Sequence, residues 1–118
     1  MRTDEAILAF SQSEKIKAGL IWSTTGLELL EGLPLDEKKG AQRIINSLMG
    51  LISREINLAK VVAGQGEWDS LKAYIDRAIA MLESGVPGEA IPQLSRALSK
   101  VTNIGQQTMS LLKEKELL

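Results

Sequence analysis

The sequence predicts an all-α fold, an up-down-up-down antiparallel four-helix bundle with a shorter third helix, formed as a single domain over residues 1–118. Apolar residues recur at alternating intervals of three and four in four segments, which places their side chains on one face of a helix. The stretches between these segments are short and contain glycine or proline, so consecutive helices should pack as antiparallel neighbours. No segment shows the strict alternation of apolar and polar residues that is typical of a half-buried strand.

The first helix is predicted over residues 4–31. Thr3 is a suitable N-cap, and Asp4 and Glu5 place negative charge in the first turn, where the helix dipole favours it. A Gly-Leu-Pro sequence ends the helix. Residues 23–26 are poor helix formers, so a kink or a break at that point is compatible with the sequence.

The second helix is predicted over residues 36–63, between the capping residue Asp36 and the glycine-containing turn at 64–66. Its apolar face is expected to consist of Ala41, Ile44, Ile45, Leu48, Ile52, Ile56, Ala59 and Val62.

The third and fourth helices are predicted over residues 68–84 and 88–115, as a hairpin that turns at Gly85. Pro92 falls in the first turn of the fourth helix, where its missing amide hydrogen has no partner within the helix in any case. The two apolar seams are Trp68, Leu71, Ile75, Ala78 and Leu82, and Ile91, Leu94, Leu98, Val101, Gly105, Thr108 and Leu112.

Part of this hairpin resembles a tetratricopeptide repeat. The resemblance is carried by Gly85, Ala90, Ile91, Leu94, Ala97 and Leu98, with Ala78 at the small position of the preceding helix. It covers about one repeat, the expected terminal proline is replaced by Thr102, and no second copy follows at a spacing of about 34 residues. A single repeat cannot bury its own apolar face, so we interpret the resemblance as convergence on helical-hairpin packing.

Composition and charge exclude several classes of function. The chain has 14 basic and 15 acidic residues in a mixed order, and this gives no basic stripe for nucleic acid. It contains no cysteine and no histidine, which removes disulfides, thiolate metal sites and the commonest metal ligand and general base. No phosphate-binding loop or nucleophile elbow is present. We therefore predict no catalytic residues, no cofactor, no metal, no membrane insertion and no signal peptide, and expect a soluble cytoplasmic protein.

A polar layer inside the bundle is one candidate site. Aligning the helices through their turns places Glu14 and Glu55 at similar heights, both near apolar faces. Arg54, Arg96 and Lys100 lie near enough to be their partners. Inward carboxylates can share a proton or orient a small ligand, whereas long acidic side chains at the edge of an apolar face commonly reach water instead.

Surplus apolar surface is the other candidate. Several helices carry more apolar residues than a stripe of somewhat over 100° requires, and wide faces of this kind either enlarge the core or form a protein interface. The residues predicted for an interface are Trp22, Leu27, Leu30, Tyr74, Met81, Ile104 and Leu111. Of these, Ile104 and Leu111 are expected to contact either the first helix or a second chain.

These observations favour a non-catalytic protein-interaction module, adaptor or chaperone-like, that acts through apolar helix faces and forms a homodimer. The alternative is a small-molecule binder or enzyme built on the polar layer around Glu14 and Glu55.

Overall fold

The computed structural model describes residues 1–64 and 67–118, and these residues confirm the four-helix fold. The helices are α1 (Thr3–Glu31), α2 (Leu35–Val62), α3 (Trp68–Glu83) and α4 (Ala90–Glu114), with a single 3₁₀ turn, η1 (Pro87–Glu89), before α4. The third helix is the shortest, at 16 residues against 29, 28 and 25 for the others. Residues 65 and 66 of the predicted turn at 64–66 lie outside the described residues.

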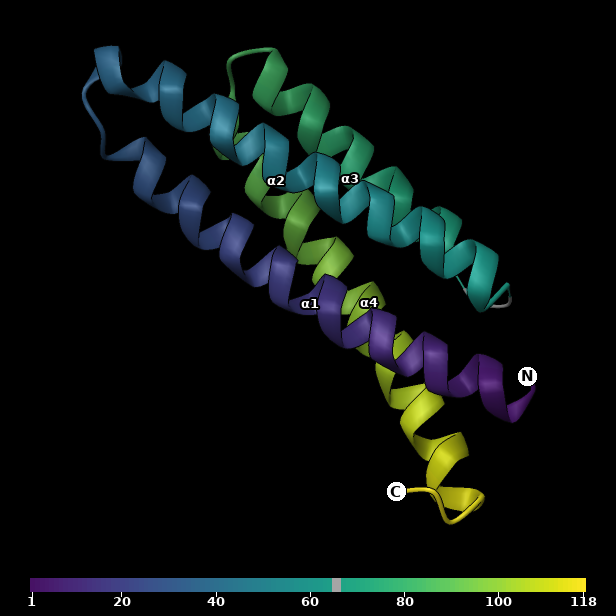
Figure 1. Cartoon of the computed structure of the whole chain (residues 1–118). Helices are drawn as coiled ribbons and strands as arrows, with labels where there is room; N and C mark the ends of the chain where they lie inside the picture. Colours follow the sequence, from purple (N-terminus) through teal and green to yellow (C-terminus); the bar gives the residue numbers. More distant parts are fainter. Residues whose placement is uncertain (65–66) are drawn as a thin grey trace.

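The four helices alternate in direction and enclose one elongated core, so that the molecule measures 53 × 21 × 18 Å (Figure 1). α1 packs against both α2 and α4, and α3 closes the bundle by packing against α2 and α4. The most extensive of these contacts is between α1 and α4. At the end of this pair, the Lys115 ammonium donates a hydrogen bond to Thr3 Oγ1 at 2.7 Å.

α1 begins at Thr3, so the predicted N-cap lies inside the helix and Arg2 occupies the capping position. The Arg2 backbone amide donates to Glu5 Oε1 at 3.1 Å, which satisfies one of the free amide groups at this helix end.

α1 is unbroken through residues 23–26. The Thr24 hydroxyl donates to the Leu20 carbonyl at 2.8 Å, as residues of this type do inside helices. Gly19 allows α2 to approach closely, because a Cβ atom at this position would lie 3.0 Å from Ile52 Cγ1. The small residues that weaken the helical propensity of α1 therefore serve helix packing.

The predicted inward face of α2 is wrong at two positions. Ile44 and Leu48 are exposed, whereas their neighbours Ile45 and Met49 are buried in the core. The inward face of the helix is therefore rotated only slightly from the predicted one, because Ile45, Ile52, Ile56 and Ala59 of the predicted face are buried.

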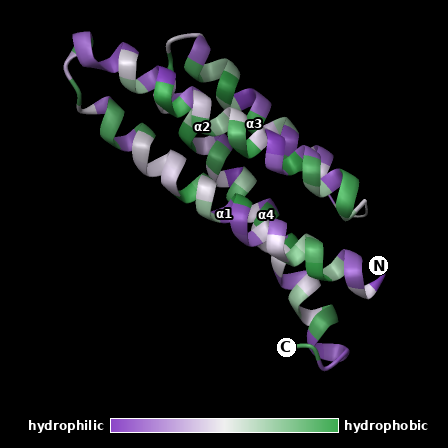
Figure 2. Cartoon of the chain, viewed as in Figure 1, coloured by the Kyte–Doolittle hydropathy of each residue, from purple (hydrophilic) through white to green (hydrophobic). Residues whose placement is uncertain are grey.

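Hydrophobic residues recur along all four helices, and the last turn of α4 is mainly hydrophilic (Figure 2). None of the helices in the described ranges combines the length and apolar character that a membrane span requires.

Candidate functional site

α2 carries two apolar seams, and the core uses only one of them. The inner seam is buried and consists of Ile45, Met49, Ile52, Ile56 and Ala59. The outer seam lies one residue earlier at each step and consists of Ile44, Leu48, Leu51, Glu55 and Leu58. Both follow the four-and-three spacing of helices that pack against one another. All four hydrophobic members of the outer seam are exposed, so α2 presents a second packing surface that no other helix of the chain covers completely.

α1 adds a parallel row of residues at seven-residue intervals, which keeps them on one side of the helix. This row consists of Leu8, Lys15, Trp22 and Leu29. Trp22 is 70% exposed, which is unusual for the largest apolar side chain. Small residues lie between the large ones, at Ser11, Ala18 and Thr25. We refer to this row and the outer seam of α2 together as the outer face.

The two halves of the outer face meet at a pocket of about 290 Å³ between α1 and α2. Its walls include Trp22 from α1 and Leu48 and Leu51 from α2. Ser23 also lines it, and the Ser23 hydroxyl is buried without a hydrogen-bond partner among the described residues. The complete lining consists of Lys15, Ile16, Gly19, Trp22, Ser23, Leu48, Leu51, Ile52 and Glu55.

One polar cluster crosses this face. Gln12 Nε2 donates to Glu55 Oε2 at 2.9 Å and to the Glu55 carbonyl at 3.0 Å, and the Lys15 ammonium lies 3.2 Å from Glu55 Oε1. The hydrogen bond from Gln12 and the charge of Lys15 hold the pKa of the Glu55 carboxyl below its ordinary value, although partial burial acts in the opposite direction. Glu55 is therefore held as a carboxylate within an otherwise apolar seam.

Exposed large hydrophobic residues are concentrated on the hairpin of α1 and α2. Besides the outer face, Ile7 and Ile21 of α1 and Leu35 and Val61 of α2 are exposed. In the part of the chain that the structure describes, α3 and α4 expose no large hydrophobic side chain, and only Val86 in their connection does so. The exposed apolar residues of the described helices therefore belong to α1 and α2.

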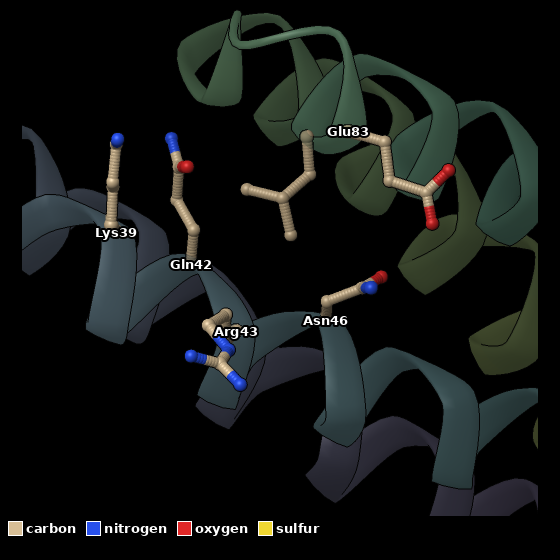
Figure 3. A pocket seen from close by; sticks show the side chains of 6 residues that line it. Lys39, Gln42, Arg43, Asn46 and Glu83 are labelled. Atoms are coloured by element: carbon tan, nitrogen blue, oxygen red, sulfur yellow. The ribbon is translucent and has the colours of Figure 1, made fainter.

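A second pocket, of about 310 Å³, lies between α2 and α3 and is lined by five polar residues and one leucine (Figure 3). Lys39, Gln42, Arg43 and Asn46 line it from α2, and Leu82 and Glu83 from α3. The charged ends of Arg43 and Glu83 point away from one another, so they do not converge on a common point (Figure 3). This arrangement does not define a binding site.

The predicted polar layer does not form. Glu14, Arg54 and Arg96 are exposed, and Lys100 pairs with Glu67 at 3.1 Å. Glu55 and Lys100 are both partly buried, but they have different partners, and the partners of Glu55, Gln12 and Lys15, were not among the predicted residues. Of the two alternatives for Glu14, the structure shows the solvent-exposed one, because α1 directs its neighbour Ser13 toward α4, where an added Cβ on Gly105 would lie 3.0 Å from Ser13 Oγ.

Three of the seven predicted interface residues are part of the core. Leu27, Leu30 and Ile104 are buried, so Leu27 and Leu30 are not the surface residues that the sequence predicted. The burial of Ile104 accompanies the extensive packing of α1 against α4, in keeping with the alternative that Ile104 contacts the first helix. Tyr74, Met81 and Leu111 are half-buried, and Trp22 is the one residue of the set that the structure places on an exposed surface.

The sequence contained a signal for the outer face, since the spacing from Ile44 to Leu58 is as regular as that of the inner seam. What it lacked was a means of telling the two seams apart, because both are almost entirely apolar.

No known protein family, curated protein or solved structure matches this chain.

Proposed function

We propose that the protein is a non-catalytic protein-interaction module, adaptor or chaperone-like in kind, that self-associates through the outer face of α1 and α2. The observation that carries this proposal is the outer seam of α2, which repeats the spacing of a helix-packing surface and remains exposed in the single chain. Burial of such an apolar surface against a partner is favourable, because it removes the surface from water.

The size of the outer face supports a stable interface. Helices of 28 and 29 residues are about 42 Å long at 1.5 Å per residue. Two such helices packed about 9 Å apart form a face roughly 20 Å wide once their side chains are included. The length multiplied by the width gives an area of about 800 Å² for each partner, which is the area that a typical specific complex buries on each side.

The composition of the face also supports a protein partner. Trp22 has the properties of an interaction hot spot, a large aromatic side chain beside an apolar pocket near the middle of a surface. A small-molecule site in a polar layer receives less support, because Glu14 faces away from Glu55.

Sedimentation equilibrium of the purified chain and two variants tests the proposal. Ile44→Glu places a charge in the outer seam at a residue that is 66% exposed, so the fold of the single chain should tolerate it. Leu35→Glu is the matched control, because Leu35 is also exposed and lies at the start of α2, outside the outer seam.

We expect the wild type and Leu35→Glu to form dimers in the micromolar range. Ile44→Glu should raise the dissociation constant at least about tenfold, because a buried unpaired charge is costly. A wild type that stays monomeric at every concentration, or equal association of all three chains, would contradict the proposal.

A further inference from the structure

We infer that two copies of the chain pair through their outer faces about a two-fold axis parallel to the helices, so that α1 of each copy packs antiparallel on α2 of the other. This inference rests on the proposed function and adds the orientation of the partner. It follows from the heights at which charged, large and small side chains lie along the two helices.

The charged residues distinguish this axis from its alternative. Lys15 and Glu55 lie at the same height, since their side chains pair at 3.2 Å. A two-fold axis parallel to the helices places each Lys15 opposite the partner's Glu55, so the two ion pairs join in an alternating network. A two-fold axis across the helices at this height would instead stack α1 on the partner's α1 and place Lys15 opposite the partner's Lys15. Like charges facing each other at an interface are unfavourable, so charge complementarity favours the parallel axis over an axis across the helices at this height.

The same axis gives Trp22 an apolar contact surface. Gly19 and Gly26 of α1 lie level with Ile52 and Ile45 of α2, where added Cβ atoms would fall within 3.0 and 3.5 Å of these side chains. Trp22 therefore lies level with Leu48, between these two points. Across the parallel axis it faces the partner's Leu48 and the partner's Leu51, which form a wall of the partner's pocket.

The small residues of the face complete the fit. Ser11, Ala18 and Thr25 separate the large side chains of α1 and leave space for the ridge of a facing helix. At the height of Ala18, the outward residue of α2 is Arg54, which is exposed. In the inferred dimer, Ala18 lies opposite the partner's Arg54.

Disulfide trapping tests the orientation directly, because the chain contains no cysteine of its own. Ala18→Cys and Arg54→Cys are made as separate chains, one of them carrying a size tag. Each variant then carries a single cysteine, so every disulfide that forms joins two chains. Under mild oxidation we expect the mixture to give a cross-linked heterodimer, and Ala18→Cys alone to give little product. Efficient trapping of Ala18→Cys with itself, or no trapping in the mixture, would overturn the orientation.

A substitution series tests the role of Trp22. Trp22→Ala should weaken dimerisation at least about tenfold. Ile21→Ala is the matched control, because Ile21 is also an exposed apolar residue of α1 but points away from the groove with α2. Equal association of the two variants would overturn the contact between Trp22 and the partner.

The result for Ile44→Glu distinguishes a failure of the inferred orientation from a failure of the proposed self-association. If the wild type is a dimer that Ile44→Glu dissociates, but trapping and Trp22→Ala fail, the orientation is wrong and the proposed function stands. If the wild type does not associate, both are overturned.

Discussion

Glu55 is the one charged residue in the outer seam of α2, among apolar neighbours. It occupies a position in the outer seam that is otherwise filled by leucine or isoleucine, and Gln12 and Lys15 satisfy its carboxylate. A single polar residue within an apolar helix-packing seam commonly fixes register and partner orientation at some cost in stability. The inferred dimer gives Glu55 this role, since it faces the partner's Lys15.

The lowered pKa of Glu55 predicts a pH dependence of stability. Its value in the folded chain lies below the ordinary 4.5, so the carboxylate contributes stability fully above that pH. The contribution is lost as the pH falls through the value of the folded state. The free energy of unfolding should therefore exceed that of Glu55→Gln by a constant amount near neutral pH, and the difference should shrink below 4.5.

Urea unfolding across this pH range, at protein concentrations low enough to keep the chain monomeric, measures the difference. Gln12→Ala keeps the charge of Glu55 but removes its hydrogen-bond donor, the largest cause of the lowered pKa, and should reduce the same pH dependence. A difference between wild type and Glu55→Gln that grows toward low pH would contradict this interpretation.

At the scale of the helices, the sequence predicted the number, order and approximate ends of the elements. It did so because the turns contain glycine and proline and because each helix has a regular apolar pattern. It did not predict the rotation of α2. The pairs Ile44–Ile45 and Leu48–Met49 offer two nearly equivalent apolar seams, and only the packing of the other three helices selects between them.

The rotation of α1 was underdetermined for a related reason. Its last third is apolar on nearly every side, so Leu27, Leu30 and Trp22 were equal candidates for the surface. In the structure, Leu27 and Leu30 are buried and Trp22 is exposed. A helix without a polar face carries no local signal of its orientation, which is set by its neighbours.

Substitution of two glycines by alanine tests the packing between helices. Gly50 lies in α2 with no atom within 4 Å of an added Cβ, so Gly50→Ala should raise the free energy of unfolding by about 1 kcal/mol through helix propensity. Gly105 lies in α4 where an added Cβ would meet Ser13 Oγ at 3.0 Å, and that hydroxyl already donates to the Phe10 carbonyl at 2.7 Å. Gly105→Ala should therefore gain nothing and be at least about 1 kcal/mol less stable than Gly50→Ala.

Chemical denaturation of the two variants beside the wild type measures this difference. Equal stabilisation by both substitutions would show that α1 and α4 do not approach each other as closely at Ser13 as the structure indicates.

At the scale of the whole molecule, the bundle is asymmetric. In the described residues, α3 and α4 have no large hydrophobic side chain in an exposed position, whereas α1 and α2 retain an apolar outer face. The surplus apolar surface lies on α1 and α2, whereas four of the seven residues predicted for it, Tyr74, Met81, Ile104 and Leu111, belong to α3 and α4.

We propose that the outer face is the interface between two copies of the chain. Amide chemical shifts recorded by nuclear magnetic resonance from micromolar to millimolar protein test it most directly, because they locate the contact without any substitution. We predict that the shifts that change with concentration cluster on α1 around Trp22 and on α2 from Ile44 to Leu58, while those of α3 remain constant. Changes centred on α3 and α4, or no change with concentration, would contradict the claim.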